Sequence, residues 1–316
     1  MRAVLVKNEK GPVENLYIGE IETPNPQDGE VLVKIKAFGL NRMDIYQRIG
    51  GYPVPAGASQ ILGVEFSGVV HALGNNSTKW KIGDEVFGLV GGGAYAEFAL
   101  APEGQLLPKP SHLSWAEAAS IPEAFLTAYQ ALILICDFKK DESVLVHAGA
   151  SGVGVAAIQL ARFLGASSVI TTASTQEKLA WLHDTVGATH TANYKTSDFS
   201  ETVKSATEGH GVDVIVDFVG QSHWAKNIDS LAVDGRMVIL AFLSGANVPE
   251  VDLGQLLRKR LRIQGSTLRS RTLSSEKGTG ALKTYIHKVY PWTEIQAATR
   301  EMETAANSGK IIAEIV

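Results

Sequence analysis

The chain has 316 residues, and at about 150 residues per domain this length favours two domains with a core each. Hydrophobic residues make up 45% and charged residues 20% of the sequence, and the net charge of −4 argues against a large nucleic-acid interface. The single cysteine, Cys136, excludes an intramolecular disulfide and a multi-cysteine zinc cluster.

The sequence predicts neither a targeting segment nor a membrane span. Residues 1–11 contain a short apolar run broken by charged side chains, which does not fit a signal peptide. The longest apolar run, residues 131–136, is too short to cross a bilayer. We therefore expect a cytoplasmic protein without membrane contact, and a reducing compartment is compatible with one cysteine.

The first third of the chain is rich in short runs that are typical of β-strands, separated by turn signals. These runs are residues 3–6, 31–37, 69–72, 85–89 and 95–100. Residues 41–49 are the exception, because they predict a short helix that begins at the cap Asn41. Many short strands with few helices predict a compact, barrel-like β domain.

Strand-like and helix-like segments alternate after Ser114, which forms a capping-box pattern with Glu117. The predicted strands are residues 144–147, 168–172, 190–193, 212–218, 237–242 and 261–265, and the predicted helices are 153–164, 176–183, 199–206, 224–231 and 253–259. This alternation predicts a parallel, doubly wound sheet. After Thr267 it stops, and a strand at 287–290, a helix at 294–302 and a strand at 311–316 are candidates to return to the first domain.

A glycine-rich turn at residues 148–154 directly follows a predicted strand and opens a predicted helix, as a dinucleotide-binding turn requires. Gly149 and Gly152 would let backbone N–H groups reach a pyrophosphate, and Gly154 would let the helix pack close to the strand. The alternative is a tight turn without a ligand. A nucleophile elbow around Ser151 is disfavoured, because it needs glycine where Val153 stands.

The end of the second strand indicates which dinucleotide is preferred. An NAD site places a carboxylate there for the ribose 2′-hydroxyl, but residues 171–174 contain none. Instead Ser174 is followed by Lys178, and a hydroxyl with an ammonium suits a 2′-phosphate. The sequence therefore predicts NADP(H) as the cofactor, the alternative being that Lys178 is a solvated helix residue.

Several segments across nearly the whole chain match one family in combination. They are residues 39–44, 62–68, 83–86, 126–129, 144–154, 156–161, 193–195 and 265–271. On these residues the chain resembles the zinc-independent quinone oxidoreductases of the medium-chain dehydrogenase/reductase superfamily, particularly the NADPH quinone reductase and zeta-crystallin branch. The resemblance implies an α/β protein with a GroES-like β-barrel domain (residues 1–124 and 278–316), a Rossmann NADP-binding domain (residues 125–277) and a nicotinamide in the cleft between them.

The same resemblance bears on zinc. Zinc-dependent relatives have a cysteine in the segment that matches residues 39–44 and a histidine before the Glu of residues 63–65. Here Met43 lies near the first position and Val64 occupies the second, so we expect no catalytic zinc. Cys136, in an apolar run, is interpreted as a core residue.

The resemblance also implies roles for individual residues. Asn41, Asp44, Tyr46 and Tyr52 are expected around the nicotinamide and substrate, with either tyrosine able to donate to a developing oxyanion or merely to pack as an aromatic. The expected cofactor-binding residues are Thr127, Ser151, Gly152, Val153, Gly154, Ser174, Lys178, Tyr194, Phe242, Leu268 and Asn307. Phe242 as an ordinary core aromatic is the alternative for that position.

The leading hypothesis is an NADPH:quinone oxidoreductase that transfers hydride to a quinone without zinc. The alternatives are an enone or enoyl-thioester reductase with Tyr52 as proton donor, or a weakly catalytic NADPH-binding protein with a sensor, structural or RNA-binding role. The basic residues 258–262 fit a solvated helix end better than an RNA site, and His71 and His147 are interpreted as core residues. A homodimer is expected through the edge strand at 261–265.

One departure from the resembling family concerns the segment after residue 271. Relatives have a further helix there, whereas residues 274–277 run almost directly into residues 278–285. About one helix is expected to be absent, either as a natural shortening or because a piece is omitted.

Overall fold

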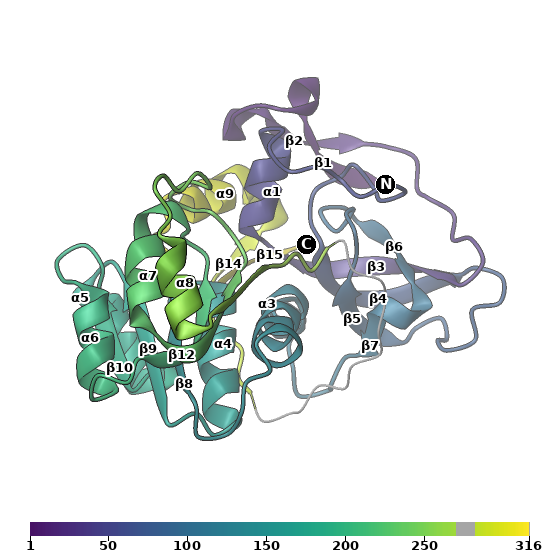
Figure 1. Cartoon of the computed structure of the whole chain (residues 1–316). Helices are drawn as coiled ribbons and strands as arrows, with labels where there is room; N and C mark the ends of the chain where they lie inside the picture. Colours follow the sequence, from purple (N-terminus) through teal and green to yellow (C-terminus); the bar gives the residue numbers. More distant parts are fainter. Residues whose placement is uncertain (270–281, 316) are drawn as a thin grey trace. The chain divides into compact units, whose positions relative to one another are not determined.

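The computed structural model describes residues 1–269 and 282–315 (Figure 1). These residues form two compact units. Unit 1 contains Met1–Glu123, Arg269 and residues 283–315, and unit 2 contains Ala124–Leu268. The chain therefore builds unit 1 from both of its ends. The predicted limits at residues 124 and 278 stay a prediction, and the second lies outside the described residues, as does most of the segment with the expected missing helix.

Unit 1 is built mainly on antiparallel strands with β3 at the centre, while β14 pairs with β15 in parallel. Its described strands are β1 (Arg2–Val6), β2 (Leu16–Glu20), β3 (Glu30–Gly39), β4 (Glu65–Leu73), β5 (Glu85–Leu89), β6 (Phe98–Pro102), β7 (Leu106–Pro108), β14 (Ile286–Pro291) and β15 (Lys310–Glu314). The main sheet has the order β14-β15-β3-β4-β5-β7, with β6 also paired to β3, while β1 pairs with β2. The register places Ile312 opposite Gly39, so the C-terminal strand returns to the first domain.

The helices of unit 1 are short and lie near the strand ends. They are α1 (Arg42–Arg48), α2 (Trp115–Ala119) and α9 (Ile295–Glu303), and α3 (Pro122–Tyr129) begins here. Ser114 caps α2, because its hydroxyl accepts from the Glu117 N–H at 3.2 Å while the Glu117 carboxylate accepts from the Ser114 N–H at 2.7 Å. The predicted capping box is confirmed.

Unit 2 is a parallel sheet with helices on both faces. Among the described residues its strands are β8 (Ser143–Val146), β9 (Ser168–Ala173), β10 (His190–Asn193), β11 (Val212–Asp217), β12 (Leu231–Ile239) and β13 (Arg262–Gly265). The strand order is β10-β9-β8-β11-β12-β13, and every pair is parallel. In sequence order this is 3-2-1-4-5-6, the arrangement of a doubly wound dinucleotide-binding sheet. The predicted fold class is confirmed.

The helices of unit 2 follow their strands in the predicted alternation. They are α4 (Gly152–Phe163), α5 (Gln176–Trp181), α6 (Phe199–Ala206), α7 (Trp224–Ser230) and α8 (Leu253–Lys259), with π-helical segments at Gln130–Ile135 and Leu182–Val186. One core cluster joins alternate strand residues such as Leu145 and Ile215 to Phe199 of α6 and Ile228 of α7. Because strand side chains alternate, the equally buried Val144 and Val146 lie on the other face, where α4 contacts β8.

The strand predicted at residues 237–242 was placed too late. β12 already begins at Leu231, where we predicted the end of a helix, and it ends at Ile239. Asp234 has a φ of 64° inside this strand, so the Asp234–Gly235 pair bends the strand without ending it.

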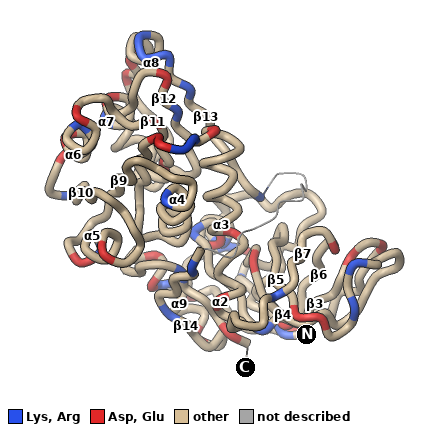
Figure 2. The backbone as a smooth tube through the Cα atoms, turned by 90° about the horizontal axis from the view of Figure 1, so that it is seen from below, with Lys and Arg blue, Asp and Glu red and all other residues tan. Residues whose placement is uncertain are grey.

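The basic residues at the end of α8 have partners inside unit 2. Arg260 forms an exposed ion pair with Asp234, and the Lys259 amine donates to backbone carbonyls at the end of α7 at 2.8 to 3.0 Å. Acidic residues lie beside basic ones around α8 in Figure 2. The run therefore caps a helix and pairs with carboxylates, which supports its interpretation as a helix end.

One helical stretch, Trp115–Ile135, is long and apolar enough to cross a membrane by length and composition alone. It joins α2, α3 and the π-helical segment, so it exceeds the apolar run that the sequence indicated. Half of its apolar window is buried in the structure, and α2 ends at the cap Ser120 before Pro122 starts α3. A buried core helix passes the same test, so this stretch is weak evidence for a membrane.

Candidate active site

The glycine turn of unit 2 connects β8 to α4 through a sharply bent backbone. Ala148 adopts a left-handed conformation with a φ of 47°, and the Gly149 N–H donates to the Thr172 carbonyl at 3.0 Å. A Cβ on Gly149 would lie 2.0 Å from Thr171 Oγ1, and one on Gly154 would lie 2.5 Å from the Ala148 carbonyl oxygen. Glycine is therefore required at both positions by the packing of the turn itself.

Ser151 is the N-cap of α4, and its hydroxyl accepts from the Gly154 N–H at 3.0 Å. The amides of Gly152 and Val153 belong to the first helical turn, where the helix itself supplies no acceptor. An anion at this end of α4 would meet these two N–H groups and the positive end of the helix dipole.

The end of β9 separates buried hydroxyls from an accessible one. Thr171 and Thr172 are fully buried, and the Thr171 hydroxyl donates to the Val146 carbonyl at 2.7 Å. Ser174, just beyond the strand, is partly exposed. Of the hydroxyls in residues 171–174, Ser174 is therefore the one available to a ligand at this edge.

Two lysines and a tyrosine lie at the same edge as Ser174. Burial lowers the pKa of Lys178, an effect that Glu177 opposes and Lys195 reinforces. The Tyr194 N–H donates to the Ala173 carbonyl at 3.3 Å, and its side chain is 42% exposed. Ser174 thus follows β9 and Tyr194 follows the neighbouring β10, while Lys178 lies in α5 and Lys195 is an additional cation that sequence reasoning missed. Their role around a 2′-phosphate stays a prediction.

His147 is a buried structural histidine, as predicted. Its Nδ1 lies 3.0 Å from Thr172 Oγ1 and its Nε2 lies 2.7 Å from Asn227 Oδ1. Burial lowers the pKa of His147 to about 4, so the ring is neutral at pH 7. The same prediction for His71 is wrong, because that side chain is exposed and packs beside the Phe98 ring with the ring centroids 4.9 Å apart.

The predicted nicotinamide-side residues of unit 2 differ in their surroundings. Thr127 in α3 has a buried hydroxyl without a hydrogen-bond partner in the described structure. Phe242 is 51% exposed, so it is not an ordinary core aromatic, and it lies beside Gly220 at the end of β11. Leu268 is partly buried. An orphaned hydroxyl, a glycine turn and open amides at a helix start fit a nicotinamide dinucleotide.

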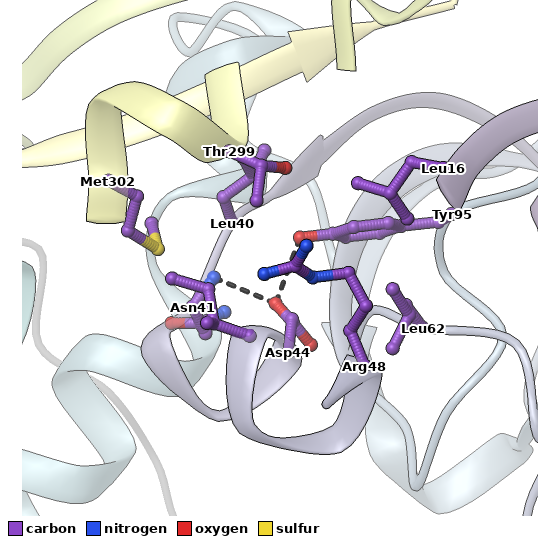
Figure 3. Close-up of a pocket in the computed structure, with 10 residues that line it drawn as sticks. Leu16, Leu40, Asn41, Asp44, Arg48, Leu62, Tyr95, Thr299 and Met302 are labelled. Carbon is purple, nitrogen blue, oxygen red and sulfur yellow. Dashed lines mark hydrogen bonds between the residues drawn. The ribbon is translucent and has the colours of Figure 1, made fainter. Parts of the chain in front are cut away.

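Asp44 in unit 1 is held by three donors, of which those from Asn41 and Tyr95 are drawn in Figure 3. Its Oδ2 accepts from the Asn41 N–H at 2.8 Å and from the Tyr95 hydroxyl at 2.9 Å, and its Oδ1 accepts from the Gly63 N–H at 3.2 Å. Burial raises the pKa of Asp44 to about 6, although these donors oppose the shift. The carboxyl is 4% exposed, so in this unit it positions α1 and the loop before β4.

Asn41 joins a buried network of charged groups. Its Nδ2 donates to Glu65 Oε1 at 2.8 Å, and its Oδ1 accepts from the Lys310 amine at 2.8 Å. Lys310 also donates to Glu65 and to the Leu40 carbonyl. A Cβ on Gly39 would lie 2.2 Å from Glu65 Oε1, so glycine makes room for this carboxylate.

This network changes the detail of the zinc argument. Val64 is buried, but Asn41 rather than Met43 is the residue of segment 39–44 whose side chain contacts Glu65. In residues 1–269 and 282–315, no three His, Cys, Asp or Glu side chains are grouped to hold a metal ion. The amine of Lys310 contributes a positive charge beside Glu65 instead.

The two predicted catalytic tyrosines have different partners in unit 1. Tyr46 is a partly exposed residue of α1 whose carbonyl accepts from the Gly51 N–H at 2.7 Å. The Arg269 guanidinium lies over the Tyr52 ring, and its Cζ is 5.6 Å from the centroid of that ring. Arg269 donates through Nε to the Gly91 carbonyl at 2.7 Å, and its buried Nη1 has no partner in the described residues.

Glu123 lies near this pair and was also missed by sequence reasoning. Its N–H donates to Glu65 Oε2 at 2.8 Å. Burial first, and then the charge of Glu65, raises the pKa of Glu123 to about 7, and Arg269 opposes the shift. Glu123, Tyr52 and Arg269 come from distant segments of the sequence. Their grouping can be recognised as a candidate site only when the fold is known.

The predicted site residues divide between the units. Unit 1 holds Asn41, Asp44, Tyr46, Tyr52 and Asn307, and unit 2 holds Thr127, Ser151, Gly152, Val153, Gly154, Ser174, Lys178, Tyr194, Phe242 and Leu268. Asn307 donates through Nδ2 to the Gly309 carbonyl at 2.8 Å, so it shapes the turn before β15. The doubly wound sheet and its glycine turn define a dinucleotide-binding α/β protein with a second, β-rich unit.

Comparison with known proteins gives the class. Residues 152–284 match the family model described as zinc-binding dehydrogenase, and residues 27–111 match the alcohol dehydrogenase GroES-like domain. Human quinone oxidoreductase is 31% identical over 99% of this chain and 97% of its own length. Quinone oxidoreductase 1 of Escherichia coli K12 is 33% identical over 96% of each chain.

Solved structures agree with this result. An NAD-dependent alcohol dehydrogenase superposes with a TM-score of 0.88 at 31% identity, over 100% of both chains. A mycobacterial protein in complex with NADPH gives a TM-score of 0.86 at 31% identity, over 100% of both chains. The CurK enoyl reductase gives 0.86 at 29% identity, covering 100% of this chain and 99% of its own.

The chain therefore belongs to the medium-chain dehydrogenase/reductase superfamily, an assignment that fits both of its units. Within it, the chain is a member of the quinone oxidoreductase family. It is an NAD(P)H-dependent oxidoreductase.

Proposed function

We propose that this oxidoreductase reduces quinones with NADPH and without zinc. The observation that carries the proposal is a polar edge of unit 2, where Ser174 follows β9, Tyr194 and Lys195 follow β10, and Lys178 in α5 is near enough to be affected by the charge of Lys195. A 2′-phosphate pairs with such cations, whereas a bare ribose diol gains most from a carboxylate, which residues 171–174 do not offer.

Quinones are proposed as the acceptor class on two grounds. The human and Escherichia coli relatives reported above are quinone oxidoreductases. A quinone also delocalises incoming charge over its own ring, so it does not need a metal to polarise its carbonyl. The environment of Asn41, Glu65 and Lys310 supports zinc independence, because an ammonium already neutralises the carboxylate there.

The bound dihydronicotinamide supplies the hydride. In unit 2, the first-turn amides of α4 would hold the pyrophosphate, and the Thr127 hydroxyl offers an unpaired donor for the carboxamide. Phe242 and Leu268 offer apolar surface for the nicotinamide ribose region. In unit 1, the Tyr52 hydroxyl would donate to the oxygen that gains charge, and Asn41 and Asp44 would hold α1 in place.

The direct test is cofactor oxidation, with NADPH and NADH run side by side against a panel of quinones and enones. We expect quinone turnover with NADPH at a kcat/KM at least about tenfold above that with NADH, and no loss after treatment with a zinc chelator. A stronger response to NADH, or activity that zinc restores after chelation, would contradict the proposal.

Enone or enoyl-thioester reduction is the second candidate, and the likeness to the CurK enoyl reductase favours it. Tyr52→Phe separates the two reactions. If Tyr52 is an obligatory proton donor, enone turnover is lost while quinone turnover remains. A purely NADPH-binding protein with a sensor, structural or RNA-binding role would bind NADPH and reduce neither class.

We further propose a cytoplasmic homodimer. β13 is the edge strand of the described sheet of unit 2, and its residues are mostly exposed. On the preceding helix α8, Leu253 and Leu257 are 68% and 81% exposed. An uncovered edge next to exposed leucines suits pairing with a second copy of the chain. The one cysteine, buried and reduced, is compatible with the cytoplasm.

A further inference from the structure

Three polar side chains of unit 1 have chemically active ends without hydrogen-bond partners among the described residues. They are Nη1 of Arg269, which is buried, and the hydroxyl of Tyr52 and the carboxyl group of Glu123, which belong to partly exposed residues. The Arg269 guanidinium lies over the Tyr52 ring, with Cζ 5.6 Å from the ring centroid. Burial has the largest effect on the pKa of Tyr52 and raises it, and the nearby charges of Arg269 and Glu123 lower and raise it, respectively. We call these residues the Tyr52–Arg269–Glu123 cluster.

Arg269 and Glu123 are each held in place by another part of the same residue. The Arg269 guanidinium is tied by Nε and Nη2 to the Gly91 carbonyl, which leaves Nη1 for another acceptor. Glu123 is tied by its backbone N–H to Glu65 Oε2, which leaves its carboxyl group unbonded. A buried donor without a partner, such as Nη1 of Arg269, is costly for folding, and a ligand acceptor that reaches it would also meet the Tyr52 hydroxyl and the Glu123 carboxyl group.

We propose that Glu123 is the proton donor to the acceptor, and that Nη1 of Arg269 together with the Tyr52 hydroxyl binds the acceptor oxygen that gains charge. This inference rests on the proposed function, because it concerns the acceptor of that reaction. In this assignment Tyr52 donates a hydrogen bond to the oxygen, and the transferred proton comes from Glu123.

The step balances as follows. The acceptor carbon receives a hydride from the dihydronicotinamide and forms a C–H bond, and the electron pair of the acceptor π system moves onto its oxygen. The O–H bond of Glu123 breaks and an O–H bond to the acceptor oxygen forms. Glu123 is left as a carboxylate and regains its proton from water, so the net reaction consumes one NADPH and one proton.

The charges around Glu123 favour this role. Burial has the largest effect and raises the pKa of Glu123 to about 7. The charges of Glu65 and Asp44 act in the same direction, and those of Lys310 and Arg269 oppose it. Burial raises the pKa of Tyr52, so its phenol is a weaker acid than in water. Near neutral pH the carboxyl is therefore the better proton donor of the two.

The first experiment measures the pH dependence of kcat for quinone and enone reduction in wild type and Glu123→Gln. Glu20→Gln is the matched control, because Glu20 is an exposed carboxylate at the end of β2. We expect kcat of wild type and of the control to fall above about pH 7. In Glu123→Gln we expect kcat to drop about 100-fold and this alkaline fall to disappear, with the Kd for NADPH changed less than twofold.

The second experiment is an infrared titration of the cofactor-free protein. A protonated-carboxyl band that disappears near pH 7 in wild type and is missing in Glu123→Gln supports the assignment, and a midpoint below pH 5 overturns it. Should Glu123→Gln not fold, Glu123→Asp replaces it and is expected to lower kcat while keeping the alkaline fall; an unchanged kcat would count against the proposal.

The experiments distinguish a failure of the proton-donor role of Glu123 from a failure of the proposed function. If wild type turns over quinones while Glu123→Gln retains both kcat and the alkaline fall, the proton-donor role is overturned and the proposed function stands. If wild type binds NADPH and reduces neither quinones nor enones, the proposed function is overturned and the proton-donor role falls with it.

Discussion

The amine of Lys310 lies against the carboxylate of Glu65 inside unit 1, and both side chains are buried. The two residues are 245 positions apart in sequence, on β15 and at the start of β4. This ion pair joins the C-terminal strand to the N-terminal sheet and orients Asn41 between its charges. It therefore holds the side chain of Asn41, one of the residues that the sequence predicts to be catalytic.

Lys310→Met is expected to destabilise the protein by about 3–5 kcal/mol, because it leaves the Glu65 carboxylate buried without its cation. Urea denaturation at pH 7 measures this loss. Arg260→Gln is the control, since its ion pair with Asp234 is exposed and its loss is expected to cost less than about 1 kcal/mol. If the two substitutions lower the free energy of unfolding equally, the buried ion pair stabilises the fold no more than the exposed one.

Local sequence signals predicted the elements of unit 2 well. The segments 190–193, 199–206 and 253–259 have the predicted bounds, since each combines a clear periodic pattern with a cap or turn at its ends. In unit 1, β2 and β7 were not predicted. β2 contains Gly19, and β7 has three residues that end at Pro108, so neither resembles a strand until its partner is known.

The candidate site was predictable only in part, for a related reason. A glycine turn is a local signal that can be read from residues 148–154 alone. Glu65, Glu123, Arg269 and Lys310 come from four distant segments, and each looks like an ordinary charged residue in sequence. The sequence predicted a strand that included Tyr95, but β6 begins only at Phe98. The Tyr95 backbone bonds to Leu62 and Val4 instead, and its hydroxyl donates to Asp44.

Lys178→Ala is expected to weaken NADPH binding about 10- to 100-fold while leaving NADH binding unchanged, because a charge-assisted bond to the 2′-phosphate contributes about 1.5–3 kcal/mol. Fluorescence titration with both dinucleotides measures the two Kd values. Lys204→Ala in α6 is the control, since its amine pairs with Glu201 and Asp229. An equal loss of affinity for NADPH and NADH would show that Lys178 does not bind the 2′-phosphate.

The buried histidines predict how stability depends on pH. Burial lowers the pKa of His147 and of His223 to about 4, from an ordinary value of 6.5. Between pH 6.5 and 4 the unfolded chain binds more protons than the folded one, so the free energy of unfolding falls as the pH falls. For His147, which is fully buried, the expected loss is about 3 kcal/mol.

His147→Gln tests this expectation, because an amide keeps hydrogen bonds possible and does not titrate. Urea denaturation between pH 4 and 8 should give a shallower acid slope in the variant, with His223 and the carboxylates responsible for what remains. Parallel profiles for wild type and variant would mean that His147 does not carry a lowered pKa.

Leu257→Glu is expected to convert the proposed homodimer into a monomer. The side chain is 81% exposed on α8, which leads into the edge strand β13, so the substitution leaves the fold of unit 2 intact and places a carboxylate in the proposed contact. Light scattering at several protein concentrations measures the mass, and circular dichroism checks the fold.

Phe163→Glu on α4, 51% exposed, is the control that should stay dimeric. A wild-type protein that is monomeric at every concentration, or a Leu257→Glu protein that remains a dimer, would place the contact elsewhere or remove it, since a two-fold interface repeats each added charge against its own copy.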